Sequence, residues 1–198
     1  MKQYIIPILA YLLAVPLLDF LNVDNYISYS ARAILTFALL VYFWKDYKIS
    51  FKLSYFALLI GIVTFISWIS LENMNLTFGN EAFVPINNLV LAAKLFSMIL
   101  VAPIVEELFA RDFLARFFVN PNNFEKVKIG AFGLLSFIIT VLVFGFSHSR
   151  WVQGIIAGIL YSTVLYKTRR IDACIQAHAV TNILLALLAI YTQNWILW

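Results

Sequence analysis

Residues 88–111 have the sequence NLVLAAKLFSMILVAPIVEELFAR, and this stretch decides the fold class. Its first part, residues 88–105, is largely apolar and close to the length of about 20 residues that a helix needs to cross a bilayer. Glu106, Glu107 and Arg111 follow it directly. An ionisable side chain within hydrocarbon costs about 2.5–3.5 kcal/mol on insertion scales, so it usually faces protein or water and has a function. The stretch therefore predicts a membrane protein with a polar site inside it.

The rest of the chain has the same apolar character. Of its 198 residues, 63% are hydrophobic and 12% are charged, against about 25% charged in an ordinary soluble domain. Further apolar stretches lie at residues 4–21, 29–44, 54–71, 129–146, 153–166 and 173–192. Together they predict an all-α, polytopic transmembrane bundle of about seven spans, with six to eight as the range. The lipid bilayer is its expected surroundings. A net charge of +4 would suggest nucleic acid in a soluble protein, but here the membrane explains it, and no nucleic acid partner is expected.

The domain organisation is predicted to be simple. We expect one integral membrane domain over residues 1–198, with loops at 72–87 and 119–128, where polar residues gather with proline. Residues 1–87 contain spans without a chemical signal, and residues 88–198 contain the polar side chains that are candidates for a catalytic core. The single Cys174 excludes an internal disulfide.

The distribution of basic residues predicts the orientation. If Met1 is cytoplasmic, one side collects eleven of the fourteen Lys and Arg: Lys2, Lys45, Lys48, Lys52, Arg111, Arg116, Lys126, Lys128, Lys167, Arg169 and Arg170. The other side has Arg32 and Arg150, and Lys94 lies within a predicted span. By the positive-inside rule, the N-terminus is cytoplasmic and the C-terminus lies on the opposite side.

The two glutamates are expected to have different roles. Glu107 and Arg111 are four residues apart, so on a helix they share a face and can pair. Glu106 points about 100° away from Glu107 and is free to face another partner. A carboxylate left in a poorly solvated site suits a general base that acts on water. The alternative is that all three side chains lie solvated at a helix end.

The two histidines lie on later apolar segments. His148 closes the run FGFSH at 144–148, and it is either an interfacial histidine or part of a site that lies deeper than hydropathy suggests. His178 and Asn182 are four residues apart and share a helical face. They predict either a helix–helix hydrogen-bond pair or two donors to a developing oxyanion.

Three ordered motifs give this chain a family resemblance: EExxxR at 106–111, FxxxH at 144–148 and HxxxN at 178–182. In this order, on apolar segments, they resemble the CPBP family, which contains the CAAX prenyl endopeptidases and many bacterial intramembrane proteases. The resemblance covers about residues 88–198. The end of the chain, AHAVTN and TQNWILW, is similar to CAAX protease-related proteins that accompany exosortase systems. One departure is Asp112, where many relatives have glycine; Arg116 is its expected partner at i+4.

The resemblance implies a function and roles for the motif residues. It implies an intramembrane endopeptidase of the bacterial cell (inner) membrane that cuts a membrane-associated polypeptide, with an exosortase-type system as a candidate partner. Glu106 and His148 would activate a water, and His178 and Asn182 would stabilise the oxyanion. Glu107 and Arg111 would support the site. The resemblance also implies a cavity that opens toward the cytoplasm.

No cofactor is required by this interpretation. Two histidines and a glutamate are a conceivable zinc ligand set, and the family is often described as metalloproteases. However, the chain has no HExxH, and glutamate–histidine activation of water needs no metal, so a bound metal is not favoured.

Other classes of function have less support in the sequence. A nucleophilic Cys174 or a serine in a GxSxG turn has little support, because the sequence contains no GxSxG and a lone cysteine in an apolar segment is usually a core residue. A transporter or proton pathway would also place charges in the bilayer, with Lys94 lining a polar path. A non-catalytic scaffold or immunity factor of the same family is the remaining alternative.

Overall fold

The fold is a helical bundle in which each predicted apolar stretch forms a helix. The computed structural model describes residues 1–74, 77–78 and 83–197, and these residues contain helices, turns and links but no strand. The helices that correspond to the apolar stretches are α1 (Lys2–Phe20), α2 (Asn25–Tyr42), α3 (Tyr55–Ser70), the continuous helix Asn88–Phe117, α7 (Leu134–Phe146), α8 (Trp151–Thr168) and α9 (Ile171–Thr192). Short 3₁₀ turns are η1 (Trp44–Asp46), η2 (Glu72–Met74), η5 (Pro121–Lys126) and η6 (Trp195–Leu197). The all-α prediction is confirmed.

Helix length and composition agree with a membrane protein. Lys2–Phe20, Asn88–Phe117 and Ile171–Thr192 are long and apolar enough to cross a bilayer, while Tyr55–Ser70 and Leu134–Phe146 are apolar but shorter. Apolar side chains cover the outside of the bundle, as hydrocarbon solvent requires, and include Leu9, Leu13, Leu17, Ile34, Leu35, Leu134, Leu135 and Ile138. The count of about seven spans stays a prediction. Part of the predicted loop 72–87, residues 75–76 and 79–82, lies outside the described residues.

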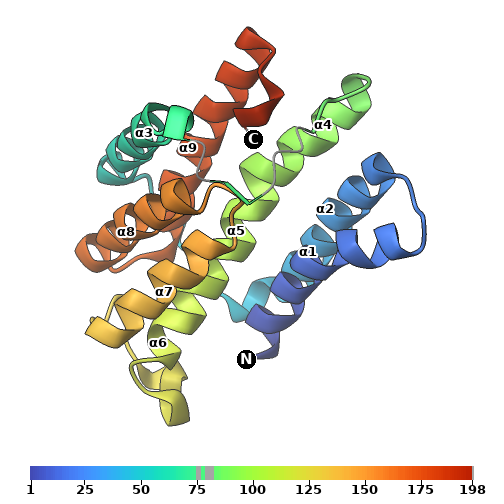
Figure 1. The fold of residues 1–198 in the computed structure, drawn as a ribbon. Helices are drawn as coiled ribbons and strands as arrows, with labels where there is room; N and C mark the ends of the chain where they lie inside the picture. The colour runs from blue at the N-terminus through green and yellow to red at the C-terminus, as the bar shows by residue number, and fades with distance from the viewer. Residues whose placement is uncertain (75–76, 79–82, 198) are drawn as a thin grey trace.

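The helix Asn88–Phe117 runs between two groups of helices. Figure 1 shows α1 and α2 on one side of it and α7, α8, α9 and α3 on the other. Its length corrects one expectation, because residues 106–111 lie inside the helix and not at the end of a span. The side chains of Glu107 and Arg111 are fully buried, so these two are not solvated at a helix end.

Two π-helical segments interrupt this helix. It consists of α4 (Asn88–Phe96), the π-helical η3 (Ser97–Val101), α5 (Ala102–Glu107), the π-helical η4 (Leu108–Leu114) and α6 (Ala115–Phe117). Pro103 is the second residue of α5, which follows η3, and it has no N–H to donate, which weakens the regular ladder at this point. Such widened turns occur frequently at functional sites, and here they flank the two glutamates.

The two ends of the bundle are each held together by links that are far apart in sequence. We call the end that contains Met1 the basic end. There Tyr47 Oη donates to Gln3 O at 2.5 Å, and Arg169 Nη1 donates to Gly130 O at 2.6 Å. At the opposite end, which we call the mouth end, Phe78 N–H donates to Ser149 O at 2.8 Å.

Arg150 joins three segments at the mouth end. Its guanidinium pairs with Glu72 and donates to Ile196 O at 3.0 Å. These bonds bring the α3–α4 link, the α7–α8 link and the C-terminal η6 together, although more than 70 residues separate the first from the second.

Candidate active site

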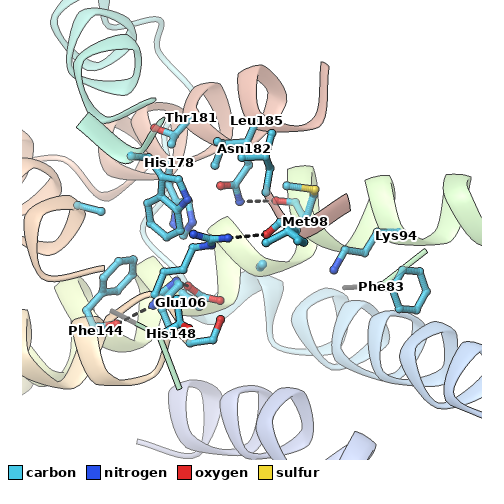
Figure 2. Close-up of a pocket in the computed structure, with 18 of the residues that line it drawn as sticks. Phe83, Lys94, Met98, Glu106, Phe144, His148, His178, Thr181, Asn182 and Leu185 are labelled. Carbon is cyan, nitrogen blue, oxygen red and sulfur yellow. Dashed lines mark hydrogen bonds and ion pairs between the residues drawn. The ribbon is translucent and has the colours of Figure 1, made fainter. Parts of the chain in front are cut away.

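A cavity of about 560 Å³ lies between the helix Asn88–Phe117 and helices α3, α8 and α9. Its lining includes all four side chains predicted to be catalytic: Glu106, His148, His178 and Asn182. Figure 2 shows Glu106 and His148 near each other on one wall, with His178 and Asn182 together on α9 and Lys94 farther along the cavity. Glu106 and His178, which are more than 70 positions apart in the sequence, thus line the same cavity.

Glu107 is the centre of a buried charge cluster. Arg111 Nε lies 3.2 Å from Glu107 Oε2, and His178 Nδ1 lies 3.0 Å from Glu107 Oε1. Arg111 also donates from Nη2 to Gly158 O at 3.1 Å. The predicted Glu107–Arg111 pair is confirmed. Because a carboxylate oxygen only accepts, Nδ1 of His178 carries a proton, and its ring is oriented by this bond.

Glu106 faces a different partner, as the helical spacing predicts. Its Oε2 lies 3.7 Å from His148 Nε2, and its side chain is 16% exposed where that of Glu107 is fully buried. Among the residues that the structure describes, Glu106 Oε2 has no hydrogen-bond partner. Glu106 is thus the carboxylate of the pair that is available to a molecule in the cavity.

His148 has a defined tautomer. Its Nδ1 lies 2.7 Å from Phe144 O, and because a carbonyl only accepts, Nδ1 carries the proton. In the neutral ring Nε2 is then an acceptor that faces Glu106. His148 belongs to the link between α7 and α8, outside both helices, and burial lowers its pKa below the usual value. The hydrogen bond to Phe144 O opposes that shift, and the charge of Arg111 adds to it.

Asn182 is held by a carbonyl group that the π-helical segment leaves free. In η3 the Ala102 N–H bonds to Ser97 O, five residues back. The next carbonyl, that of Met98, would need an N–H from Pro103, which has none. Asn182 Nδ2 supplies the donor instead and lies 2.6 Å from Met98 O. One amide N–H serves this bond, and the amide has a second.

Close helix packing and two aromatic rings position the histidines. A Cβ atom on Gly154 would lie 2.8 Å from Gly145 O, which is too close for a side chain. Helices α7 and α8 can therefore pack this closely only because position 154 is a glycine. The Phe144 ring covers Arg111, whose guanidinium carbon lies 4.0 Å from the ring centroid. Tyr161 stacks on His178 with centroids 5.0 Å apart.

Sequence reasoning missed the role of Tyr161. A signal was present, because Gly154, Ala157, Gly158 and Tyr161 recur at helical spacing and form a small-residue face that ends in an aromatic ring. The expected Asp112–Arg116 pair is confirmed, and Tyr4 Oη donates to Asp112 Oδ2 at 3.0 Å. Cys174 is fully buried and lines neither of the cavities described here, which leaves no place for it as a nucleophile.

A second cavity of about 300 Å³ shares Glu106 and His148 with the first. It lies between α1 and α7, and its lining is largely apolar: Ile8, Leu12, Phe109, Ala110 and Val143 belong to it. Leu12 and Val143 are also exposed on the outside of the bundle, where lipid would lie. The pair Glu106–His148 thus lies where a cavity that reaches the mouth end meets one that reaches the lipid-facing surface.

Two of the groups in the site are already paired: Glu107 and His178 Nδ1 are bonded to each other, and the second oxygen of Glu107 faces Arg111. That no metal ion is required stays a prediction. Across the described part of the chain, no group of three or more His, Cys, Asp or Glu side chains is arranged to hold a metal.

The fold and the site define a helical membrane protein with a buried glutamate, histidine and arginine cluster at the foot of a cavity. A family model described as "Type II CAAX prenyl endopeptidase Rce1-like" matches residues 88–184, which contain all three motifs. The match supports membership of the chain in the CPBP family, and it supports a CAAX-type membrane protease in general. No curated protein and no solved structure matches it significantly.

Proposed function

We propose that the protein is an intramembrane endopeptidase that hydrolyses a peptide bond of a membrane-associated polypeptide. The observation that carries the proposal is the convergence of Glu106, His148, His178 and Asn182 on one cavity of about 560 Å³. A transporter would need a polar path to the other end of the bundle. Instead Glu107 and Arg111 are fully buried beneath the cavity and packed against Phe144.

The proposed chemistry begins with water beside Glu106 and His148. A water molecule would donate one proton to the carboxylate of Glu106, and the resulting hydroxide would attack the peptide carbonyl carbon. The carbonyl oxygen becomes the oxyanion of a tetrahedral intermediate. Glu106 would then return the proton, through or beside His148, to the amide nitrogen as the C–N bond breaks. Atoms and charges balance without a metal or cofactor.

His178 and Asn182 are the proposed oxyanion donors. Asn182 has an amide N–H beyond the one on Met98 O, and a protonated His178 would donate from Nε2.

The substrate class follows from the two cavities. The apolar cavity between α1 and α7 would hold the hydrophobic part of a membrane-bound chain, while the larger cavity holds its extended polar part. We propose the cell membrane of a bacterium as the location. An exosortase-type partner remains a prediction from the similarity of the chain's C-terminal sequence.

The test compares peptide termini in membranes from cells that carry wild type or Glu106→Gln at equal levels. The substitution keeps the shape of the side chain and removes the base, so we expect the activity to fall about 10²–10⁴-fold. Glu125→Gln is the matched control, because Glu125 is an exposed carboxylate at the basic end. Termini that depend on Glu106 but not on Glu125 support proteolysis. Identical termini in all three strains contradict it and favour a non-catalytic scaffold.

A further inference from the structure

The larger cavity opens at the mouth end of the bundle. Its lining includes Thr77 and Phe78 from the α3–α4 link, Ser149 and Arg150 from the α7–α8 link, and Ile196 and Leu197 from the C-terminal segment. Hydrogen bonds tie these three segments to one another, so they form one continuous rim. From this rim the cavity extends inward to Glu106.

The two ends of the bundle differ strongly in charge. The basic end has nine cationic side chains outside the site, of which all but the half-buried Arg170 are exposed: Lys2, Lys45, Lys48, Lys52, Lys126, Lys128, Lys167, Arg169 and Arg170. In the sequence, residues 21–24, 71–87, 147–150 and 193–198 at the other end contain a single Lys or Arg, which is Arg150. That residue is buried and paired with Glu72.

Two more cations lie near the mouth end but belong to helices. The Arg32 guanidinium in α2 lies 4.5 Å from the Tyr11 ring centroid, and Lys94 Nζ in α4 lies 5.1 Å from that of Phe83. Arg32 and Lys94 thus lie within helices, and neither belongs to a link between helices. Even when both are counted with Arg150, the asymmetry is nine to three.

The structure corrects the assignment of two of these basic residues. Arg111 and Arg116, which the sequence assigns to the basic side, are buried in ion pairs with Glu107 and Asp112. Removing both from the basic end still leaves the strong asymmetry. Short links enriched in Lys and Arg stay in the cytoplasm, which places the basic end there.

We infer that the cavity opens toward the extracytoplasmic side of the membrane, and that the substrate is a polypeptide segment presented from that side. This inference rests on the proposed function for its substrate and on charge and geometry for its orientation. It replaces the cytoplasmic opening that the family resemblance implies, because the rim and the basic links lie at opposite ends of the bundle.

The depth of the site defines the form of the substrate. Glu106 lies twelve residues after Lys94, or about 18 Å along the helix at 1.5 Å per residue. An extended chain advances about 3.3 Å per residue, so about six residues must be unfolded to reach from the level of Lys94 to Glu106. The substrate is therefore an extended segment of an exported or membrane-anchored polypeptide next to its anchor, and not a folded domain.

The orientation is tested by labelling with a membrane-impermeant maleimide in intact cells. Asn194→Cys places a thiol at an exposed position of the mouth end, and Asn122→Cys places one at an exposed position of the basic end. The parent chain is the control, because its only thiol, Cys174, is fully buried. We expect Asn194→Cys to label in intact cells and Asn122→Cys to label only after permeabilisation. The reverse pattern overturns the inference.

Substrate presentation has a separate readout. Termini that depend on Glu106 should lie in segments of their parent proteins that have crossed the membrane, and termini in cytoplasmic segments overturn this part. The labelling result does not depend on catalysis. If Asn194→Cys is labelled in intact cells but no terminus depends on Glu106, the proposed function is contradicted and the inferred orientation still holds.

Discussion

His178 Nδ1 lies 3.0 Å from Glu107 Oε1, so a histidine of α9 is oriented by a carboxylate from the helix Asn88–Phe117. The other oxygen of the same carboxylate lies 3.2 Å from Arg111 Nε. One buried group therefore fixes both a cation and the ring that borders the cavity. This arrangement assigns Glu107 to positioning and leaves Glu106 as the group that faces the cavity.

Glu107→Ala should cost stability as well as activity. The substitution leaves Arg111 charged, buried and without its carboxylate, which typically lowers the free energy of unfolding by about 3–5 kcal/mol. Unfolding of the purified protein in detergent measures this loss. The double variant Glu107→Leu with Arg111→Met should recover much of the stability but no activity, since His178 stays without its orienting partner. An active double variant would contradict the positioning role.

The pH dependence of hydrolysis should reflect His148. Neutral His148 accepts at Nε2, so activity is present above its pKa and is lost as the pH falls through it. Burial lowers that pKa, which places the loss below the usual histidine value of about 6.5. The groups that face or influence the ring are Glu106, Glu107 and Arg111.

The measurement is the initial rate between about pH 4 and pH 8, a range that brackets the usual histidine value. His148→Gln should have a low rate, and its rate should no longer fall at the pH at which that of wild type falls. Wild type should keep its activity at pH 6.5. Half-loss of wild-type activity above that pH would argue against a neutral His148.

Asn182→Ala should reduce both rate and stability, for separable reasons. Loss of an oxyanion donor typically lowers kcat by about 10²–10³-fold, and loss of the bond to Met98 O leaves a carbonyl without a donor, which costs about 1–3 kcal/mol. Pro103→Ala separates the two effects because it restores a backbone N–H for the freed carbonyl. In a double-mutant cycle, Asn182→Ala should destabilise the Pro103→Ala background less than wild type, with kcat equally low in both. Equal destabilisation would mean that Asn182 does not replace the missing N–H.

Leu12→Trp should impair cleavage of membrane-anchored substrates only. Leu12 lines the cavity of about 300 Å³ between α1 and α7, and an indole there would fill part of it. We expect a higher KM for a peptide with a hydrophobic anchor and no change for a short soluble peptide. Leu17→Trp is the control, because Leu17 is exposed on the same helix and lines neither cavity. An equal effect on both peptides would show that the cavity does not hold the anchor.

Local sequence determined the class of this protein. The apolar stretches alone predict a helical membrane bundle, because a polypeptide in hydrocarbon must satisfy its backbone hydrogen bonds within each segment. Helical spacing also predicts the pairs Glu107–Arg111 and Asp112–Arg116 and the divergence of Glu106 from Glu107. These relationships span at most four residues, so they follow from helix geometry and need no knowledge of the fold.

Only the tertiary structure decided which groups meet. His148 reaches Glu106 because Gly145 and Gly154 let α7 and α8 approach closely, and His178 reaches Glu107 across 71 residues of sequence. The bond from Asn182 to Met98 O depends on a π-helical turn before Pro103, which no pattern in the sequence predicted. The sequence also did not predict the end of the bundle at which the cavity opens. It depends on three distant links that form one rim, and packing between helices, not the periodicity of any one of them, places those links at the same end.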